Sequence, residues 1–320
     1  MHLVKKIKFM TQKKILILGA GVIGSIYAGR LAAAGNSVTI LARNTRLKEL
    51  QENGLCLKNN KEERIEKIEI NTISELKKED VYDFIFVTLH NAQVSSILPI
   101  LKDNLSPNII FMVNTCDGYS EWTAALGEKR VIPAFPGAGG RLNDGIVYYE
   151  ITSKAVQPTT IGEIDGSKSP RLKELTQILE NSRFPIEVSS NMDAWQKTHV
   201  AMMCSMINVI YYDGGTNYTV SKNPKAIHQM ILALKEAFDF LKKSGVGIVP
   251  SNLSFLLFCP FWIIKILIKF AYNTKWAETV IGTPALASPH DYKMLSDDFL
   301  KLSSDKGFNL NEFKKLSLPA

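Results

Sequence analysis

Residues 13–35 read KKILILGAGVIGSIYAGRLAAAG, and this stretch decides the fold. Its apolar run, residues 15–18, is typical of a buried parallel strand. The run leads directly into the glycine pattern GAGVIG. Small and apolar residues then recur at helical spacing until Gly35, a residue type that commonly ends helices. The stretch therefore predicts a strand, a tight turn and a helix.

Each glycine of this turn has a physical role in a dinucleotide site. Gly19 makes the turn, Gly21 lets a pyrophosphate approach the backbone, and Gly24 lets the helix pack closely on the strand. The helix N-terminus offers free N–H groups and a partial positive charge to the phosphates. A second apolar run, residues 37–41, completes a βαβ unit of the expected size, which weighs against an ordinary glycine-rich turn. The predicted cofactor contacts are Gly19, Ala20, Gly21, Val22, Ile23 and Gly24.

The end of the second strand predicts which dinucleotide binds. A site for NAD places a carboxylate there for the ribose hydroxyls, whereas a 2′-phosphate requires a guanidinium and no nearby anion. No acidic residue lies between Gly24 and Glu49, and the strand continues into the basic sequence ARNTR. We therefore predict NADP(H), with Arg43 at the 2′-phosphate and Asn44 or Arg46 assisting. The alternative is that Arg43 is a solvated loop residue.

The composition excludes several other classes of protein. The chain has 320 residues, of which 46% are hydrophobic, so it is long enough for two domains or one large one and can fill their cores. The net charge of +7 is modest and the lysines are interspersed with glutamates, so nucleic acid is not an expected partner. The cysteines form no CxxC or Cys/His pattern, which indicates reduced thiols, no metal site and a cytoplasmic protein. Residues 1–10 lack the apolar segment and cleavage site of a signal peptide.

Two further apolar runs deliver polar side chains to the carboxyl ends of predicted strands. Residues 82–89 end at His90, and residues 108–113 end at Asn114. Ligands of open α/β sheets bind outside the carboxyl ends of the strands, so both side chains are candidate site residues.

The whole chain predicts an α/β fold in two parts. The first, residues 1–190, is an NADP-binding Rossmann-type domain with a doubly wound sheet. Within it we expect a helix interrupted near Pro99 and an antiparallel hairpin at residues 145–162, which makes the sheet mixed. The second, residues 191–320, is an all-α domain for substrate binding or dimerisation, with the site in the cleft between the two. Its predicted helices are residues 193–212, 223–244, 251–272 and 288–307.

Residues 253–272 form the most apolar stretch of the chain. Its length alone would admit a membrane span, but Pro260, Lys265 and Lys269 argue against one. The two lysines lie four residues apart and hence on one helix face. We expect a core or dimer helix, with a membrane-surface helix as the alternative.

With these motifs in place, the chain resembles the ketopantoate reductase family, also called 2-dehydropantoate 2-reductases. The likeness is carried by the glycine stretch followed by VTILAR, and then by FVTLHNAQV, GGRLNDG, TTIGE and WQKTH. It is specific in the N-terminal half and loose in the C-terminal half. The resemblance implies an NADPH-binding Rossmann domain, a helical domain and hydride transfer to a 2-keto acid.

The family's functional positions match this chain in part. Members usually carry a lysine after VTL, near cofactor and substrate, where this chain has His90. The family asparagine near the nicotinamide is similar to Asn114. The catalytic lysine of the family's W-x-K motif is similar to Lys197.

Three family positions differ, and all of them belong to the substrate pocket. The first substrate-binding asparagine is replaced by Ala201, and the next falls at Ser205. The acidic residue of the last long helix has no match at residues 292–294. The resemblance therefore implies the cofactor more strongly than it implies pantoate as the product.

Ketone reduction requires a donor at the carbonyl oxygen, where negative charge develops as hydride arrives at carbon. We predict that Lys197 is this donor. On a helix it shares one face with Ala201, Ser205 and Asn208, which would line the cleft. His199 lies about 200° away from it, so we expect a packed histidine there.

The other histidines have weaker cases. His90 is a second catalytic candidate, as a proton donor or to orient the substrate, because its reference pKa is near ~6.5. The alternative is a histidine at a strand end with no catalytic part. For His228 and His290 we expect structural roles.

We therefore predict an NADPH-dependent oxidoreductase that acts on a small 2-keto acid or related carbonyl. One alternative is an NADP(H)-binding protein with little or no turnover. Another is an opine-type or imine reductase on the same plan. A homodimer is a further expectation.

Overall fold

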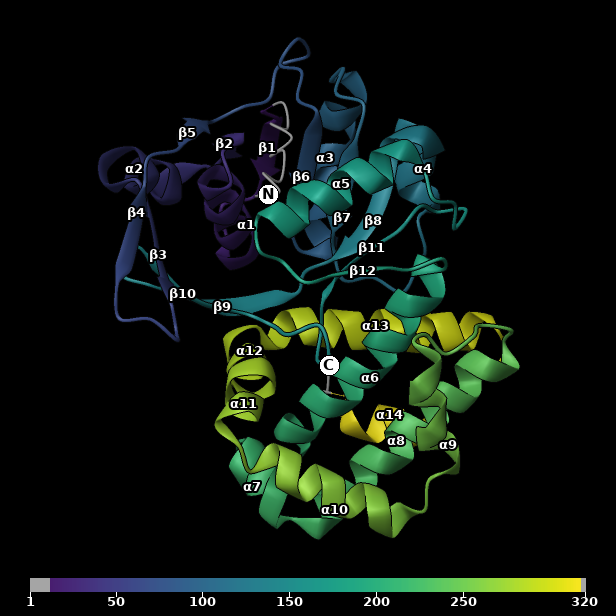
Figure 1. The fold of residues 1–320 in the computed structure, drawn as a ribbon. Coiled ribbons are helices and arrows are strands. Elements are labelled where there is room, and N and C mark those ends of the chain that lie inside the picture. The colour runs from purple at the N-terminus through teal and green to yellow at the C-terminus, as the bar shows by residue number, and fades with distance from the viewer. Residues whose placement is uncertain (1–11, 318–320) are drawn as a thin grey trace, which may run out of the picture.

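A computed structural model describes residues 12–317, except the side chain of Pro284. Residues 1–11 and 318–320 lie outside this description. The prediction about residues 1–10 therefore concerns residues that the structure does not describe. Figure 1 shows an α/β part that contains the described strands, and a helical part formed by the chain after residue 190. The predicted fold class, a Rossmann-type sheet followed by an all-α region, is confirmed.

The α/β part is built on an eight-stranded sheet. Its parallel strands lie in the order β5-β2-β1-β6-β7-β8, which is the strand order of a dinucleotide-binding fold. The order reverses between β1 and β6, so the site is expected at the carboxyl ends of these two strands. In chain order the strands of this sheet are β1 (Lys14–Leu18), β2 (Ser37–Leu41), β5 (Asn71–Ile73), β6 (Phe84–Val87), β7 (Ile109–Met112), β8 (Val131–Phe135), β11 (Thr159–Ile161) and β12 (Ile186–Val188).

Helices cover both faces of this sheet (Figure 1). In chain order they are α1 (Val22–Ala33), α2 (Asn44–Asn53), α3 (Asn91–Asp103), α4 (Ser120–Leu126), the 3₁₀ turn η1 (Glu128–Arg130) and α5 (Pro170–Asn181). Alternate residues of β1 point to opposite faces. Ile15 and Ile17 join the apolar core that includes α1 and α5, whereas Leu16 and Leu18 join the core that includes α3 and α4. The sheet is therefore buried on both faces, as its continuous apolar runs predict.

A second, four-stranded sheet lies beside α1, and it corrects one prediction. The hairpin predicted at residues 145–162 is wrong: β10 pairs with β9 and β3, while β11 joins the large sheet antiparallel to β8. The reason is local, because Asp144 and Gly145 both have positive φ and close a tight hairpin before β10 begins. The mixed sheet itself is confirmed. The strands are β3 (Leu55–Asn59), β4 (Ile65–Ile68), β9 (Ala138–Asn143) and β10 (Ile146–Ile151).

The helical part is organised around α6, which packs against α8, α13 and α14. Helix α6 also joins the two parts, because Met192 and Trp195 in its first turn belong to a core of the α/β part. The helices here are α6 (Met192–Asp213), α7 (Asn217–Lys222), α8 (Pro224–Lys243), α9 (Phe255–Phe258), α10 (Phe261–Tyr272), α11 (Lys275–Ala277), α12 (Thr283–Ala287), α13 (Pro289–Asp305) and α14 (Asn311–Leu316), with the short turns η2 (Ser251–Ser254) and η3 (Glu278–Gly282) between them.

Two helix predictions that involve proline need correction. Helix α3 runs through Pro99 without interruption. Pro99 is exposed, so water can hydrogen-bond the carbonyl that lacks an N–H partner, while Leu98 and Leu101 hold the helix on the core. In contrast, residues 251–272 are not one helix, because Cys259 is extended and Pro260 begins a new helix, α10.

Helix α10 is also not the core helix that its apolar sequence predicts. Of its residues only Ile264 and Tyr272 are buried, and most of its outward-facing side chains are exposed. Among residues 12–317, no helix combines the length and apolarity needed to span a bilayer.

Candidate functional site

The glycine turn between β1 and α1 is sterically locked. Gly19 has a φ of +117°, which a side chain rarely adopts. A Cβ on Gly24 would lie 1.9 Å from the carbonyl oxygen of Gly19 and 2.6 Å from Oγ1 of Thr88. That Thr88 hydroxyl donates to the Gly19 carbonyl at 3.0 Å, so β6 holds the turn in place. The predicted roles of Gly19 in the turn and of Gly24 in close packing agree with this geometry.

The N-terminus of α1 offers unoccupied backbone donors. Gly21 is the N-cap residue, no side chain in residues 12–317 caps the helix, and its first turn contains no acidic residue. Around the missing Cβ of Gly21 no atom lies within 4 Å. An uncapped helix start beside open space fits a phosphate group, because the N–H groups of Val22 and Ile23 lie in the first turn.

Arg43 and Arg46 follow β2 but have different surroundings. Arg43 is exposed at the N-cap of α2, and its side chain has no hydrogen bond or ion pair with any residue in the described part of the chain. Arg46 folds back onto the glycine turn: its Nε donates to the carbonyl of Ala20 at 3.2 Å, and it pairs with Glu49 at 3.0 Å. Arg46 therefore braces the turn, and of the two arginines only Arg43 has a free guanidinium.

Asn44 lies beside Arg43 at the start of α2. It is exposed and has a φ of +49°, in the left-handed region that asparagine tolerates better than most residues. Asn44 therefore stays a candidate next to the 2′-phosphate position.

Asn114 follows β7 at the carboxyl edge of the sheet. Its Oδ1 atom is buried and accepts no hydrogen bond from any residue between 12 and 317. A buried acceptor without a donor is costly and needs an explanation. An N–H group of a bound ligand would satisfy it, as the predicted position near the nicotinamide requires.

The start of α6 is tied to the ends of two strands by Gln196. Its Nε2 donates to the carbonyl of Val113, which follows β7, at 3.0 Å, and to that of Ala134 in β8 at 3.3 Å. The hydroxyl of Tyr119 donates to Oε1 of Gln196 at 2.8 Å. Burial raises the pKa of Tyr119, so this hydroxyl keeps its proton. These bonds position the next residue, Lys197, beside the loop that follows β7.

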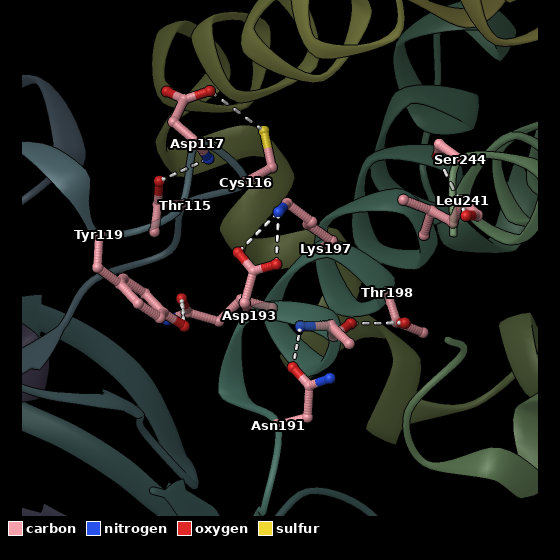
Figure 2. A network of polar contacts seen from close by, with 12 residues as sticks. Thr115, Cys116, Asp117, Tyr119, Asn191, Asp193, Lys197, Thr198, Leu241 and Ser244 are labelled. Atoms are coloured by element: carbon pink, nitrogen blue, oxygen red, sulfur yellow. Dashed lines mark hydrogen bonds and ion pairs between the residues drawn. The ribbon is translucent and has the colours of Figure 1, made fainter. Parts of the chain in front are cut away.

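Lys197 is held by the carboxylate of Asp193, one turn earlier on α6, with Nζ–O distances of 2.7 and 2.5 Å (Figure 2). The lysine side chain is 12% exposed, whereas the side chain of Asp193 is 41% exposed, so the lysine is shielded and the carboxylate stays open to water. Loss of hydration raises the pKa of nearby Asp117, and the ammonium groups of Lys301 and Lys197 partly offset this rise. Asp193 therefore fixes the position of the Lys197 side chain near Asp117 in the loop that follows β7.

His90 ends the β6 segment and begins α3. Its Nδ1 lies 3.1 Å from Oδ2 of Asp291 on α13, so it joins the α/β part to the helical part. Asp298, two turns later on α13, interacts with Asn91. Partial burial raises the pKa of Asp298, and the nearby carboxylate of Asp117 raises it further. The last long helix thus does bring two carboxylates, Asp291 and Asp298, to the start of α3, and both lie outside residues 292–294.

The expected polar stripe along α6 does not line the cleft beyond Lys197. Ala201 is fully buried in the helical core, and the hydroxyl of Ser205 donates to the Ala201 carbonyl within the helix. Asn208 donates to Ser296 on α13 at 2.9 Å. This prediction is wrong because α13 covers that face of α6, which helical spacing alone cannot show.

The prediction of a packed His199 is confirmed. Its ring stacks on Trp195, with ring centroids 5.0 Å apart, and contacts Phe135. Burial lowers the pKa of His199 to about 3, so it is neutral at physiological pH. His228 contacts the ring of Phe261, and His290 is exposed beside Asp291.

Buried His199 is expected to make the fold sensitive to mild acid. The unfolded chain binds a proton at this histidine below about pH 6.5, whereas the folded chain does so only near pH 3, so stability falls as the pH falls through this window. Between about pH 8 and pH 5 we expect His199 to cost about 2 kcal/mol of unfolding free energy. His199→Phe, which keeps a ring but cannot titrate, should lose correspondingly less in urea titrations at the two pH values. Equal losses in both proteins would contradict the assignment.

Comparison with known proteins connects this geometry to a family. Residues 15–166 match the family described as ketopantoate reductase PanE/ApbA. The α/β part of the chain is therefore similar to the ketopantoate reductase family. This is a family of oxidoreductases that use a nicotinamide dinucleotide, and the glycine turn and sheet order of this chain are of that type.

The sequence relatives are distant. A 2-dehydropantoate 2-reductase of Pyrococcus horikoshii is 23% identical over 250 residues, which cover 76% of this chain and 78% of that protein. An uncharacterized oxidoreductase of Bacillus subtilis, YkpB, is also 23% identical, over 58% of this chain and 60% of its own length. The similarity to both relatives is therefore low in identity, and the one to the Pyrococcus reductase extends over about three quarters of the chain.

Solved structures extend the likeness over the whole fold. A 2-dehydropantoate 2-reductase from Geobacter metallireducens superposes with a TM-score of 0.76 at 13% identity, over 94% of this chain and 97% of that chain. A D-mandelate dehydrogenase solved with NADH and anilino(oxo)acetate superposes with a TM-score of 0.75 at 15% identity, over 95% of this chain and 96% of that chain. At such identities the likeness shows the fold.

Several residues of the site are not among those predicted from the sequence. Thr88 locks the glycine turn, Gln196 ties α6 to the sheet, and Asp193 holds Lys197. Of these, Asp193 has a local signal, since it lies four residues before Lys197 on the same helix face. The others act across long distances in sequence.

Proposed function

We propose that this chain is an NADP(H)-dependent reductase of a small 2-keto acid or a related carbonyl compound. The observation that carries the proposal is that Gln196 fastens α6 to the carboxyl ends of β7 and β8, beside the loop that begins with Asn114. Because Lys197 and Asp193 lie one turn apart on α6, this contact also brings their ion pair close to the carboxyl ends of the strands, where we propose that the cofactor binds. A cation, an unpaired amide oxygen and an uncapped glycine turn then share one edge of the fold.

The residues present fit a nicotinamide dinucleotide. The uncapped start of α1 would hold the pyrophosphate, the buried Oδ1 of Asn114 would accept a hydrogen bond from the nicotinamide carboxamide, and Arg43 would face the 2′-phosphate. The cofactor, when bound, supplies the hydride.

Lys197 would act on the oxygen of the substrate carbonyl. As hydride reaches carbon, negative charge grows on that oxygen, and the ammonium group stabilises it and donates a proton. Asp193 positions this ammonium group by two short hydrogen bonds. His90, on the opposite side of the interface and paired with Asp291, would orient the substrate or supply a second proton.

Removal of the Arg43 guanidinium should change the choice of cofactor. Because a charge-assisted contact to phosphate contributes about 1.5–3 kcal/mol, Arg43→Ala should weaken NADPH binding by roughly 10- to 100-fold and leave NADH binding nearly unchanged. Fluorescence titration with both cofactors measures this. Lys48→Ala, which removes an exposed cation from the same helix, is the matched control. An equal loss for both cofactors in Arg43→Ala would refute the 2′-phosphate role.

We also propose the domain boundary, the location and the oligomeric state of the protein. We place the domain boundary at residue 190, with residues 191–320 as the substrate domain. The location is proposed as cytoplasmic, which the four free cysteines support. A homodimer remains part of the prediction, without a contact that identifies its interface.

The direct test is consumption of NADPH absorbance with a panel of 2-keto acids, with and without added amines. Turnover of a 2-keto acid alone supports the proposal. Turnover only when an amine is present would instead assign an opine-type or imine reductase. Tight NADPH binding without turnover of any compound would assign a binding protein.

A further inference from the structure

The outer surface of α9 and α10 carries a concentration of exposed aromatic side chains. Seven of the sixteen large hydrophobic side chains that are strongly exposed in the described chain lie within residues 255–276. The most exposed are Phe258 at 74%, Phe270 at 69% and Trp262 at 65%. Figure 1 places α10 at the end of the helical part that lies away from the eight-stranded sheet. This surface is therefore separate from the candidate site, and such a concentration of exposed apolar side chains indicates an interaction.

Most of the charged groups around this surface are lysines, and one of them, Lys243, pairs with Asp239 at 2.7 Å. Residues 240–277 contain five lysines and no aspartate or glutamate. Lys269 and Lys275 are exposed and form no ion pair with any residue from 12 to 317. Lys242 lies over the ring of Phe258, with 5.3 Å between Nζ and the ring centroid. Aromatic and basic side chains are thus interleaved on one face, as in helices that lie in the plane of a membrane.

The geometry of α10 suits a helix that lies on a bilayer. Its inner side, through Ile264 and Tyr272, packs against α7 and α8. Its outer side carries Trp262, Ile266 and Phe270, with Lys269 on the flank. At about 1.5 Å per residue its 12 residues span roughly 18 Å, less than the ~30 Å core of a bilayer. Insertion of the rings to the headgroup level would leave the lysines at the lipid phosphates.

Charge also distinguishes a membrane from a second copy of the chain. A two-fold contact would place this surface against itself, and Lys269 and Lys275, which have no ion pair within residues 12–317, would then approach the same lysines of the second copy. Anionic lipid supplies the missing negative charge. We propose that α9 and α10 dock the protein on an anionic membrane surface.

The test uses the full-length protein and sedimentation with vesicles of phosphatidylcholine, alone or with one quarter phosphatidylglycerol. We expect binding to the anionic vesicles, loss of binding at high salt, and little binding to phosphatidylcholine alone. Phe258→Ser/Phe270→Ser should lower the bound fraction at least ten-fold. The matched control, Leu105→Ser/Val156→Ser, removes two exposed apolar side chains from the α/β part and should bind as wild type. Because each surface lysine contributes about five-fold in affinity, Lys269→Glu should weaken binding by more than that factor.

Tryptophan fluorescence gives a second readout that does not depend on mutating the apolar face. Trp122 and Trp195 are buried, whereas Trp262 and Trp276 are exposed. In Trp276→Phe, a blue shift on addition of anionic vesicles would therefore report insertion of Trp262. No shift and no sedimentation would overturn the proposal. Equal binding to both vesicle types would also overturn it, as would a dimer that the Phe258→Ser/Phe270→Ser variant dissociates in the absence of lipid binding.

Discussion

Lys197→Ala should lower kcat by about 10²- to 10⁴-fold on whichever carbonyl compound the panel identifies, because a positioned proton donor contributes about that much to the rate. NADPH binding should change by less than about two-fold, since the ammonium group acts on the substrate oxygen and not on the phosphates. Stopped-flow measurement of NADPH oxidation and fluorescence titration of NADPH separate the two effects.

The control for Lys197→Ala is a second lysine with the same local geometry. Lys243 pairs with Asp239 one turn earlier on α8 at 2.7 Å, and this pair lies in the helical part, outside the candidate site. Lys243→Ala should therefore retain full activity and nearly full stability, as is usual for an exposed pair. A Lys197→Ala variant with wild-type kcat would exclude this lysine as the donor and leave His90 as the remaining candidate.

Gly24→Ala should destabilise the fold by about 3 kcal/mol or more and abolish dinucleotide binding. The added Cβ would lie 1.9 Å from the carbonyl oxygen of Gly19 and 2.6 Å from Oγ1 of Thr88. Neither atom can withdraw easily, because the first is backbone and the second is held by hydrogen bonds to the carbonyls of Leu18 and Gly19. Chemical denaturation without cofactor measures the loss of stability.

Gly21→Ala is the matched comparison in the same turn. No atom lies within 4 Å of its missing Cβ and its φ of −71° suits any residue, so the unfolding free energy should change by only a few tenths of a kcal/mol. The new methyl group would occupy the space proposed for the pyrophosphate, so NADPH affinity should fall by roughly ten-fold or more. Unchanged NADPH affinity in Gly21→Ala would show that the cofactor does not cross this turn.

Local patterns in the sequence determined the Rossmann part of this protein. The glycine turn could be predicted because its constraints act between neighbours in the chain: a positive φ at Gly19, a close approach at Gly24 and a helix that starts at once. Apolar runs likewise placed β2 at its observed residues and β1 within one residue of them. His90 and Asn114 are candidate site residues because they follow strand ends, where ligands of such sheets bind.

Tertiary structure alone decided what surrounds these residues. Helical spacing put Lys197, Ala201 and Asn208 on one face, but only the packing of α13 shows that this face is covered beyond the lysine. In the same way, the sequence does not show that the guanidinium of Arg46 donates a hydrogen bond to the glycine turn while that of Arg43 is free. The partners in both cases lie far away in the chain, so no local pattern contains them.

For the apolar stretch at residues 253–272, the sequence again determined the local structure and the tertiary fold determined the burial. Its composition determined that it forms helix, and Pro260 determined where that helix breaks. Which of its apolar faces is buried depends on where α7 and α8 lie, and these helices cover only one side of α10. The hydrophobicity of a sequence shows which side chains favour burial. Which neighbouring element buries each of them depends on the tertiary fold.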